Sequence, residues 1–191
     1  MALGVEGVLL TGGASRRMGI DKASILVDGE PMALRIAKAL SGRCDKVTVL
    51  GREPIAGFDF LPDASEYAGP LAALSRFETA ADLFFLASCD LVSFDPRLIG
   101  ELIERLGEHD AVIPVLDGRS QPLCALYRAS TLARLRETVS AGESRVMAWI
   151  ASIDALEVPA DELTHGRACR SVNTPDELRQ SAGHRTDGVV E

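Results

Sequence analysis

The sequence has few of the residues that build disulfide frameworks, metal centres or membrane spans. Its 191 residues include four cysteines and three histidines, and no two cysteines are spaced as CxxC. Scattered thiols favour isolated buried cysteines in a reducing compartment over a disulfide framework or a zinc site. No apolar run approaches the roughly 18 residues that mark a transmembrane helix, and the start, MALGVEGVLL, lacks the basic segment of a signal peptide. We therefore expect a cytoplasmic protein without a membrane partner.

Positive charge is also scarce. The chain has 20 lysines and arginines against 28 aspartates and glutamates, which gives a net charge of −8 at neutral pH. Nucleic-acid affinity comes largely from the neutralisation of phosphates by basic side chains, so this composition argues against a nucleic-acid partner. Any anion site in this chain must be local.

What the chain does have is the composition of an ordinary globular domain. Hydrophobic residues make up 47% and charged residues 25%, and a chain of this length can bury about 70% of its unfolded surface. We expect a single domain over residues 1–182. Residues 183–191, GHRTDGVVE, show no apolar periodicity and are expected to form a disordered tail.

Strand-like and amphipathic helical patterns alternate along the chain, which predicts an α/β fold with a mainly parallel sheet. A turn at 117–122 between two apolar runs predicts a hairpin, and with it some antiparallel character. Strands are expected at 5–11, 45–51, 58–63, 82–88, 110–115, 123–128, 155–159 and 169–173. Helices are expected from Pro31 onward, at 69–81 and 95–107, about Leu132 to Val139, at 143–152 and at 174–180.

Two local patterns make specific structural predictions. Asp95 and Gly107 are placed to cap and to end the helix at 95–107. Met147 and Trp149 are interpreted as core residues, because such side chains at helical spacing are more often core than ligand contacts.

Glycine and positive charge are concentrated in LLTGGASRRMGIDK, residues 9–22, directly after the first expected strand. The pattern is neither a Walker phosphate loop nor a G-x-G-x-x-G dinucleotide loop. A tight turn with incidental arginines would explain the glycines alone. However, Gly12 and Gly13 let backbone N–H groups approach an anion, and one hydroxyl and several cations follow. The loop therefore favours a polyphosphate site at the carboxyl end of a strand.

Asp90 is the second candidate feature, because it follows a fully apolar strand at 82–88. An aspartate here could cap the next helix, but Asp95 already suits that role. A lone carboxylate facing phosphates is typical of a Mg²⁺ site, where phosphates and water complete the coordination shell. We therefore expect Asp90 to hold Mg²⁺ beside a nucleotide.

The loop and the segments after it resemble the molybdenum cofactor guanylyltransferases, which belong to the nucleotidyltransferases of the sugar-nucleotide type. That family's loop has approximately the pattern L-x-G-G-x-S-x-R-M-G-x-D-K. PDASEYAGPLAAL, ASCDLV, DGRSQPLCALYR, AGESRVMAWI and SVNTPDEL resemble later family segments, so the match spans about residues 5–180. The residues that match the loop pattern are Leu10, Gly12, Gly13, Ser15, Arg17, Met18, Gly19, Asp21 and Lys22.

The sequence departs from the family pattern in two ways. One group of departures lies at Ala73, at Leu91 and at Ser171, where the family usually has other residues. In addition, the position after the second strand is often asparagine in the family, whereas Leu50 or Gly51 stands here. The nucleotide contact that the asparagine makes in the family is therefore not expected from this position.

The resemblance implies a three-layer α/β/α domain with a mostly parallel sheet and a Rossmann-like nucleotide-binding half, of the nucleotide-diphospho-sugar transferase type. It implies that Asp63 touches the nucleoside and Asp90 holds Mg²⁺. Arg17, Lys22 and Asp90 are the implied catalytic residues. The implied nucleotide and metal-binding residues are Leu10, Thr11, Gly12, Gly13, Ser15, Lys22, Asp63 and Asp90.

The implied reaction is the Mg²⁺-dependent transfer of GMP from GTP to molybdenum-bound molybdopterin, with release of pyrophosphate. Transient contacts with cofactor-insertion proteins or molybdoenzyme chaperones are also expected. Arg119, Arg145 and Asn173 are candidate contacts for the acceptor, or alternatively solvated loop residues and caps, and Asn173 could instead help to hold the metal. Two other functions stay open at this point: a cytidylyltransferase that uses CTP, and a nucleotide-binding regulator without catalysis.

Overall fold

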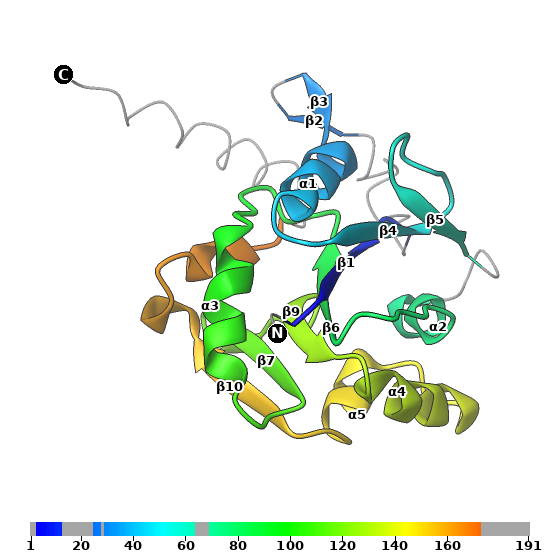
Figure 1. Cartoon of the computed structure of the whole chain (residues 1–191), viewed down its shortest axis with the longest axis vertical. Coiled ribbons are helices and arrows are strands. Elements are labelled where there is room, and N and C mark those ends of the chain that lie inside the picture. Colours follow the sequence, from blue (N-terminus) through cyan, green and yellow to red (C-terminus); the bar gives the residue numbers. More distant parts are fainter. Residues whose placement is uncertain (1–2, 13–24, 28, 64–68, 173–191) are drawn as a thin grey trace.

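A computed structural model of the chain describes residues 3–12, 25–27, 29–63 and 69–172, and its centre is one large sheet (Figure 1). The strand order is β10-β7-β9-β6-β1-β4-β5, with β8 paired to β7. The strands are β1 (Val5–Leu10), β4 (Lys46–Gly51), β5 (Asp59–Pro62), β6 (Leu83–Ser88), β7 (Ala111–Leu116), β8 (Arg119–Ser120), β9 (Cys124–Arg128) and β10 (Ala155–Pro159). A separate two-stranded sheet joins β2 (Leu26–Val27) to β3 (Glu30–Pro31).

Most neighbouring strands of the large sheet are parallel. β1 lies between β4 and β6 and is parallel to both, β4 is parallel to β5, and β7 is parallel to β10. β9 is antiparallel to both β6 and β7, so β7 runs in the direction of β6. The predicted hairpin is present as the antiparallel pair β7 and β9, and β8, which lies within the expected turn, also pairs with β7. The predicted α/β class with a mostly parallel sheet is confirmed.

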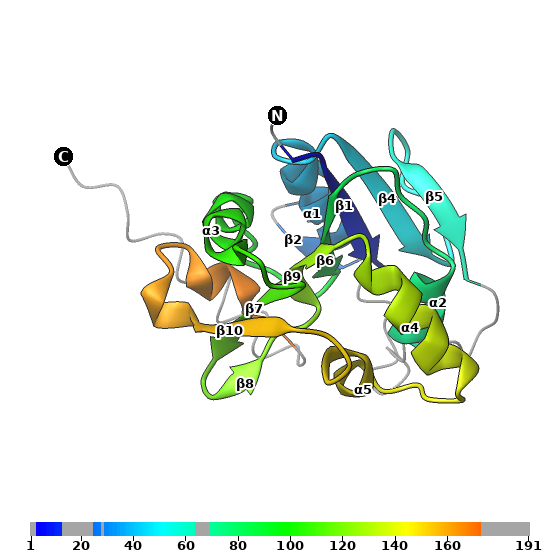
Figure 2. The ribbon, with the colours of Figure 1, turned by 60° about the horizontal axis from the view of Figure 1, so that its bottom comes forward.

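Helices cover both faces of this sheet, which gives three layers (Figure 2). The core cluster on one face contains apolar residues of α1 (Met32–Ser41) and α3 (Arg97–Leu106). The cluster on the other face contains residues of α2 (Pro70–Ser75), α4 (Thr131–Ser140) and α5 (Val146–Ile150). Alternate residues of one strand supply the two clusters, as the side-chain alternation of a strand requires: Phe85 belongs to the first and Phe84 to the second.

Helix α3 has the ends that its sequence predicts. The Asp95 side chain accepts a hydrogen bond from the backbone N–H of Arg97 at 2.9 Å, and therefore satisfies a donor that has no partner inside the helix. At the other end Gly107 has φ 48°, a conformation that favours glycine, and the chain turns there into β7. After β10, two short 3-10 helices follow, η3 (Ala160–Glu162) and η4 (Gly166–Cys169).

Two predicted elements differ from the structure. The helix expected at 69–81 ends at Ser75, where the guanidinium of Arg136 on α4 donates to the carbonyl oxygen of Ser75 and to that of Phe77 beyond the helix. The expected strand at 169–173 is wrong over its described part. Cys169 closes η4, and Val172, which belongs to no strand, donates a backbone hydrogen bond to the Asp90 carbonyl.

The prediction that Met147 and Trp149 on α5 are core residues is correct for Trp149 only. Trp149 is fully buried and its indole N–H donates to the carbonyl of Thr131, whereas half of Met147 is exposed. The helix expected at 174–180 and the tail at 183–191 lie outside the described residues.

A buried carboxylate ties three segments together beneath the sheet. Glu6 on β1 is only 4% exposed, and its oxygens accept hydrogen bonds from the hydroxyls of Thr48 at 2.6 Å and Thr79 at 2.7 Å. The Lys46 ammonium lies 3.8 Å away. Because charged groups are rarely buried without such partners, these contacts account for the presence of Glu6 in a strand of apolar residues.

Replacement of Glu6 by alanine is expected to lower the free energy of unfolding by about 1–3 kcal/mol, because it leaves the Thr48 hydroxyl buried without its acceptor. Urea denaturation measures the loss. Glu53→Ala removes the same charge from an exposed position and serves as the control. Equal unfolding midpoints for the two variants would contradict this role of Glu6.

Candidate nucleotide site

The carboxyl ends of four parallel strands meet at one edge of the sheet. Leu10 at the end of β1 is in register with Leu50 on β4 and with Ser88 on β6, and Gly51 is in register with Pro62 on β5. The residues that follow these strands therefore gather there, as predicted for ligand sites of open α/β sheets. They include Thr11, Gly12, Asp63 and Asp90.

Asp63 lies against the backbone of Gly12. A Cβ atom on Gly12 would be only 2.4 Å from Oδ2 of Asp63, so no larger residue fits there while the carboxylate keeps its place. The backbone of Asp63 is also fixed, because its N–H donates to the Gly51 carbonyl at 2.8 Å. Gly12 thus has a structural reason to be glycine, besides the access to an anion that its sequence context predicts.

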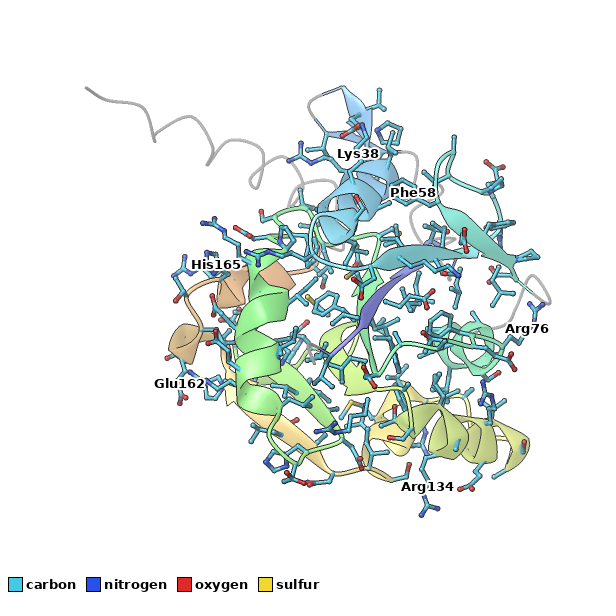
Figure 3. The ribbon with its side chains drawn as sticks, in the orientation of Figure 1. Lys38, Phe58, Arg76, Arg134, Glu162 and His165 are labelled. Carbon is cyan, nitrogen blue, oxygen red and sulfur yellow. The ribbon has the colours of Figure 1, made fainter. Side chains whose placement is uncertain are left out.

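The guanidinium of Arg76, from the end of α2, gives β5 a further anchor. It donates to the carbonyl of Pro62 at 2.5 Å, directly before Asp63. The Arg76 side chain is labelled beside α2 in Figure 3. No sequence pattern predicts this contact, since it depends on where α2 ends.

Thr11 fills the space beside Gly51. Its N–H and its hydroxyl both donate to the carbonyl of Leu50, at 2.9 and 3.3 Å. A Cβ atom on Gly51 would lie 2.0 Å from the Thr11 hydroxyl oxygen, while the Leu50 side chain is fully buried. The position where the family often has asparagine therefore offers no polar side chain in this chain. The Thr11 side chain thus requires glycine at position 51, a dependence that the sequence alone did not reveal.

Asp90 is held at the end of β6 by both its backbone and its side chain. Its carbonyl accepts hydrogen bonds from the N–H groups of Val92 at 3.1 Å and Val172 at 3.0 Å. Its carboxylate accepts one from the hydroxyl of Ser88 at 2.6 Å. Since Asp95 caps α3, Asp90 is not that helix's cap, as predicted.

The donor set around Asp90 fits the kind of metal that the sequence indicates. Among the residues that the structure describes, no group of three or more histidine, cysteine, aspartate or glutamate side chains could hold a metal ion. Mg²⁺ does not need such a cluster, because it is commonly bound by one or two carboxylates together with phosphates and water.

Several predicted site residues cannot be placed. Gly13, Ser15, Arg17 and Lys22 lie outside the described residues, as does Asn173. Their roles stay predictions from the sequence. In the chain, the first four fall within ten residues after Gly12, which lies at the sheet edge.

The two described acceptor candidates are exposed. Arg119 lies on β8, next to a turn in which Asp117 and Gly118 have φ 51° and 72°. The Arg145 guanidinium donates to the carboxylate of Glu143 at 2.6 and 3.0 Å and thereby lowers the pKa of that carboxyl to about 2. Among the described residues, Arg145 thus has a local ionic partner, and contact with an acceptor stays a prediction for both arginines.

The cysteines have the character that their spacing predicts. All four are free and buried. Burial raises the pKa of the Cys44 thiol to about 12 and that of Cys169 to about 11, so neither forms a thiolate near neutral pH. No helix in the described part of the chain has the length and apolar character to cross a membrane.

Comparison with known sequences places this geometry among nucleotidyltransferases. The family model for the MobA-like NTP transferase domain matches residues 7–157. The chain is 31% identical over 194 residues to a probable molybdenum cofactor guanylyltransferase of Natronomonas pharaonis, covering 92% of this chain and 95% of the relative. It is 34% identical over 194 residues to a molybdenum cofactor guanylyltransferase of Burkholderia vietnamiensis, covering 91% and 93%.

Solved structures share the fold at lower sequence identity. Molybdopterin-guanine dinucleotide biosynthesis protein A from Archaeoglobus fulgidus is 20% identical, with a TM-score of 0.76 over 94% of this chain and 97% of its own. The 2-C-methyl-D-erythritol 4-phosphate cytidylyltransferase from Thermus thermophilus is 16% identical, with a TM-score of 0.70 over 93% and 96%. These likenesses confirm the expected fold of the nucleotide-diphospho-sugar transferase type.

Proposed function

Because the chain belongs to the MobA-like NTP transferase domain family, we propose that it transfers GMP from GTP to molybdenum-bound molybdopterin, with release of pyrophosphate. Relatives named molybdenum cofactor guanylyltransferase, above 30% identity over most of both chains, support this substrate pair. One structural observation carries the proposal: Asp63, Asp90 and the backbone of Gly12 meet at the edge where the parallel strands end.

The reaction is an in-line displacement at the α-phosphorus of GTP. The terminal phosphate of the pterin attacks, and the bond to the β-phosphate breaks as pyrophosphate leaves. The attacking phosphate monoester is already ionised, so no general base is required. Catalysis then consists mostly of positioning and of charge stabilisation.

The roles of the loop residues follow from this reaction. Gly12 and Gly13 would offer backbone N–H groups to the β- and γ-phosphates, and Arg17 and Lys22 would neutralise the charge that develops on the leaving pyrophosphate. When bound at Asp90, Mg²⁺ supplies further positive charge to the phosphates.

Asp63 is assigned to the nucleoside part of GTP. Its carboxylate lies against Gly12, so any group at position 12 controls where that carboxylate sits. Guanine is favoured over cytosine as the base, since the relatives of this chain are named guanylyltransferases.

Parallel assays with GTP and CTP test the proposal. With molybdopterin as the acceptor and Mg²⁺ present, pyrophosphate release is expected to be at least about tenfold faster with GTP, a difference of about 1.4 kcal/mol in transition-state binding. A preference for CTP would identify a cytidylyltransferase instead. Binding of GTP without any turnover would identify a nucleotide-binding regulator.

The setting of the reaction is part of the same proposal. Four free, buried cysteines suit a reducing compartment, and we place the reaction in the cytoplasm. Product transfer to cofactor-insertion proteins or molybdoenzyme chaperones would follow from the chemistry, because the dinucleotide product must reach an apoenzyme.

A further inference from the structure

Ser88 and Asp90 lie on the same side of the sheet. The hydrogen bond from the Cys89 N–H to the Leu10 carbonyl, 3.0 Å long, continues the β1–β6 ladder one residue past the end of β6. Strand alternation therefore extends to this point, and it directs the buried Cys89 side chain into the opposite core cluster. The side chains of Ser88 and Asp90 are partly exposed, and the hydrogen bond between them keeps the two side chains together.

The contact between these two side chains is short and directional. The Ser88 hydroxyl donates to Oδ1 of Asp90 at 2.6 Å, a length typical of a hydrogen bond to a charged oxygen. A carboxylate has about four acceptor sites, so it can accept this bond and also bind a cation. The Asp90 backbone is fixed independently, through the hydrogen bonds from Val92 and Val172.

We propose that Ser88 is a positioning residue that orients the Asp90 carboxylate for a divalent cation bound with the nucleotide. This inference rests on the proposed function, which assigns the cation to Asp90. A carboxylate that rotates freely loses conformational freedom when the ion binds. The hydrogen bond from Ser88 restricts the rotation of the Asp90 carboxylate before the ion binds. Groups that orient a metal-binding side chain typically change metal affinity by about 10- to 100-fold when they are removed.

A local structural role for Ser88 makes a different prediction. Serine hydroxyls commonly bond to nearby groups at the ends of strands and only stabilise the turn. In that case the loss of the hydroxyl would lower stability but would leave cation affinity unchanged. The readout must therefore include cation binding itself.

The test compares Ser88→Ala with Ser88→Thr, which keeps a hydroxyl at the same atom. Ser75→Ala is the matched control, because Ser75 is also half-buried and its hydroxyl makes a single short bond, 2.8 Å to the Ala72 carbonyl, on α2. Water proton relaxation enhancement by Mn²⁺ at saturating GTP measures the affinity of the protein for the ion. Circular dichroism confirms that each variant is folded.

Ser88→Ala is expected to weaken Mn²⁺ binding about tenfold and to raise the Mg²⁺ concentration for half-maximal pyrophosphate release by a similar factor. Ser88→Thr is expected to stay within about threefold of the unaltered protein, and Ser75→Ala to match it. Asp90→Asn separates the two levels of the argument. If Asp90→Asn weakens Mn²⁺ binding and Ser88→Ala does not, the positioning role is overturned; if Asp90→Asn binds Mn²⁺ normally, the metal assignment of the proposed function fails.

Discussion

Asp90→Asn is expected to lower the rate of pyrophosphate release at least about a hundredfold at saturating GTP and acceptor. The substitution keeps the shape of the side chain but removes the charge, at a site where charge stabilisation in the transition state is worth several kcal/mol. The Ser88 hydroxyl can still donate to an amide oxygen, so the local hydrogen bond can persist. A continuous pyrophosphate assay with varied Mg²⁺ measures the effect.

The control for this variant is available at the other end of the same strand. Asp82 precedes β6, is exposed, and accepts a hydrogen bond from the Gly4 N–H at 3.0 Å. Asp82→Asn removes an equal charge far from the candidate site and is expected to keep full activity. Undiminished Mg²⁺-dependent pyrophosphate release by Asp90→Asn would show that the metal role belongs to another group.

Gly12→Ala is expected to lower kcat/KM for GTP by about 10- to 100-fold and to reduce the preference for GTP over CTP. The new methyl group would lie 2.4 Å from Oδ2 of Asp63, so the carboxylate or the strand end must shift by about an ångström. Misplacement of that size at a binding site can cost about two orders of magnitude in rate. Steady-state kinetics with each nucleotide measure both effects.

Two further variants show whether the effect of Gly12→Ala passes through Asp63. Gly100→Ala on α3 adds a methyl group where there is open space and is expected to leave activity unchanged. In a protein that already carries Asp63→Ala, Gly12→Ala should cost much less than it does alone, because the clash is gone. Equal costs in both backgrounds would exclude this mechanism.

The nucleoside role of Asp63 rests on the family resemblance alone. The sequence itself was sufficient to predict where Asp90 lies, because Asp90 follows an apolar run and the ends of parallel strands meet at one edge whatever the order of the strands. The same logic predicted the layers of the fold and the cap of α3 by Asp95, since each depends on residues close together in the chain.

Other features depend on contacts between distant segments, which no local pattern encodes. Position 51 must be glycine because the Thr11 hydroxyl, at the end of the neighbouring strand, occupies the space of a side chain. Arg76 reaches Pro62 only because α2 ends early. The exposure of Met147 could not be predicted from the sequence either, because the buried face of α5 depends on the segments that pack against it. A strand is wrongly predicted at 169–173, because the hydrogen bond from Val172 to the Asp90 carbonyl depends on the packing of distant segments.

Mass spectrometry of the reaction product is the most direct test of GMP transfer from GTP to molybdopterin. The protein is incubated with GTP, Mg²⁺ and molybdenum-bound molybdopterin, and with CTP in a parallel sample. A guanylyltransferase is expected to form a pterin product that has gained the mass of GMP less one water, with one pyrophosphate released for each product molecule. A CMP adduct formed in preference, or GTP bound with no adduct formed, would contradict this function.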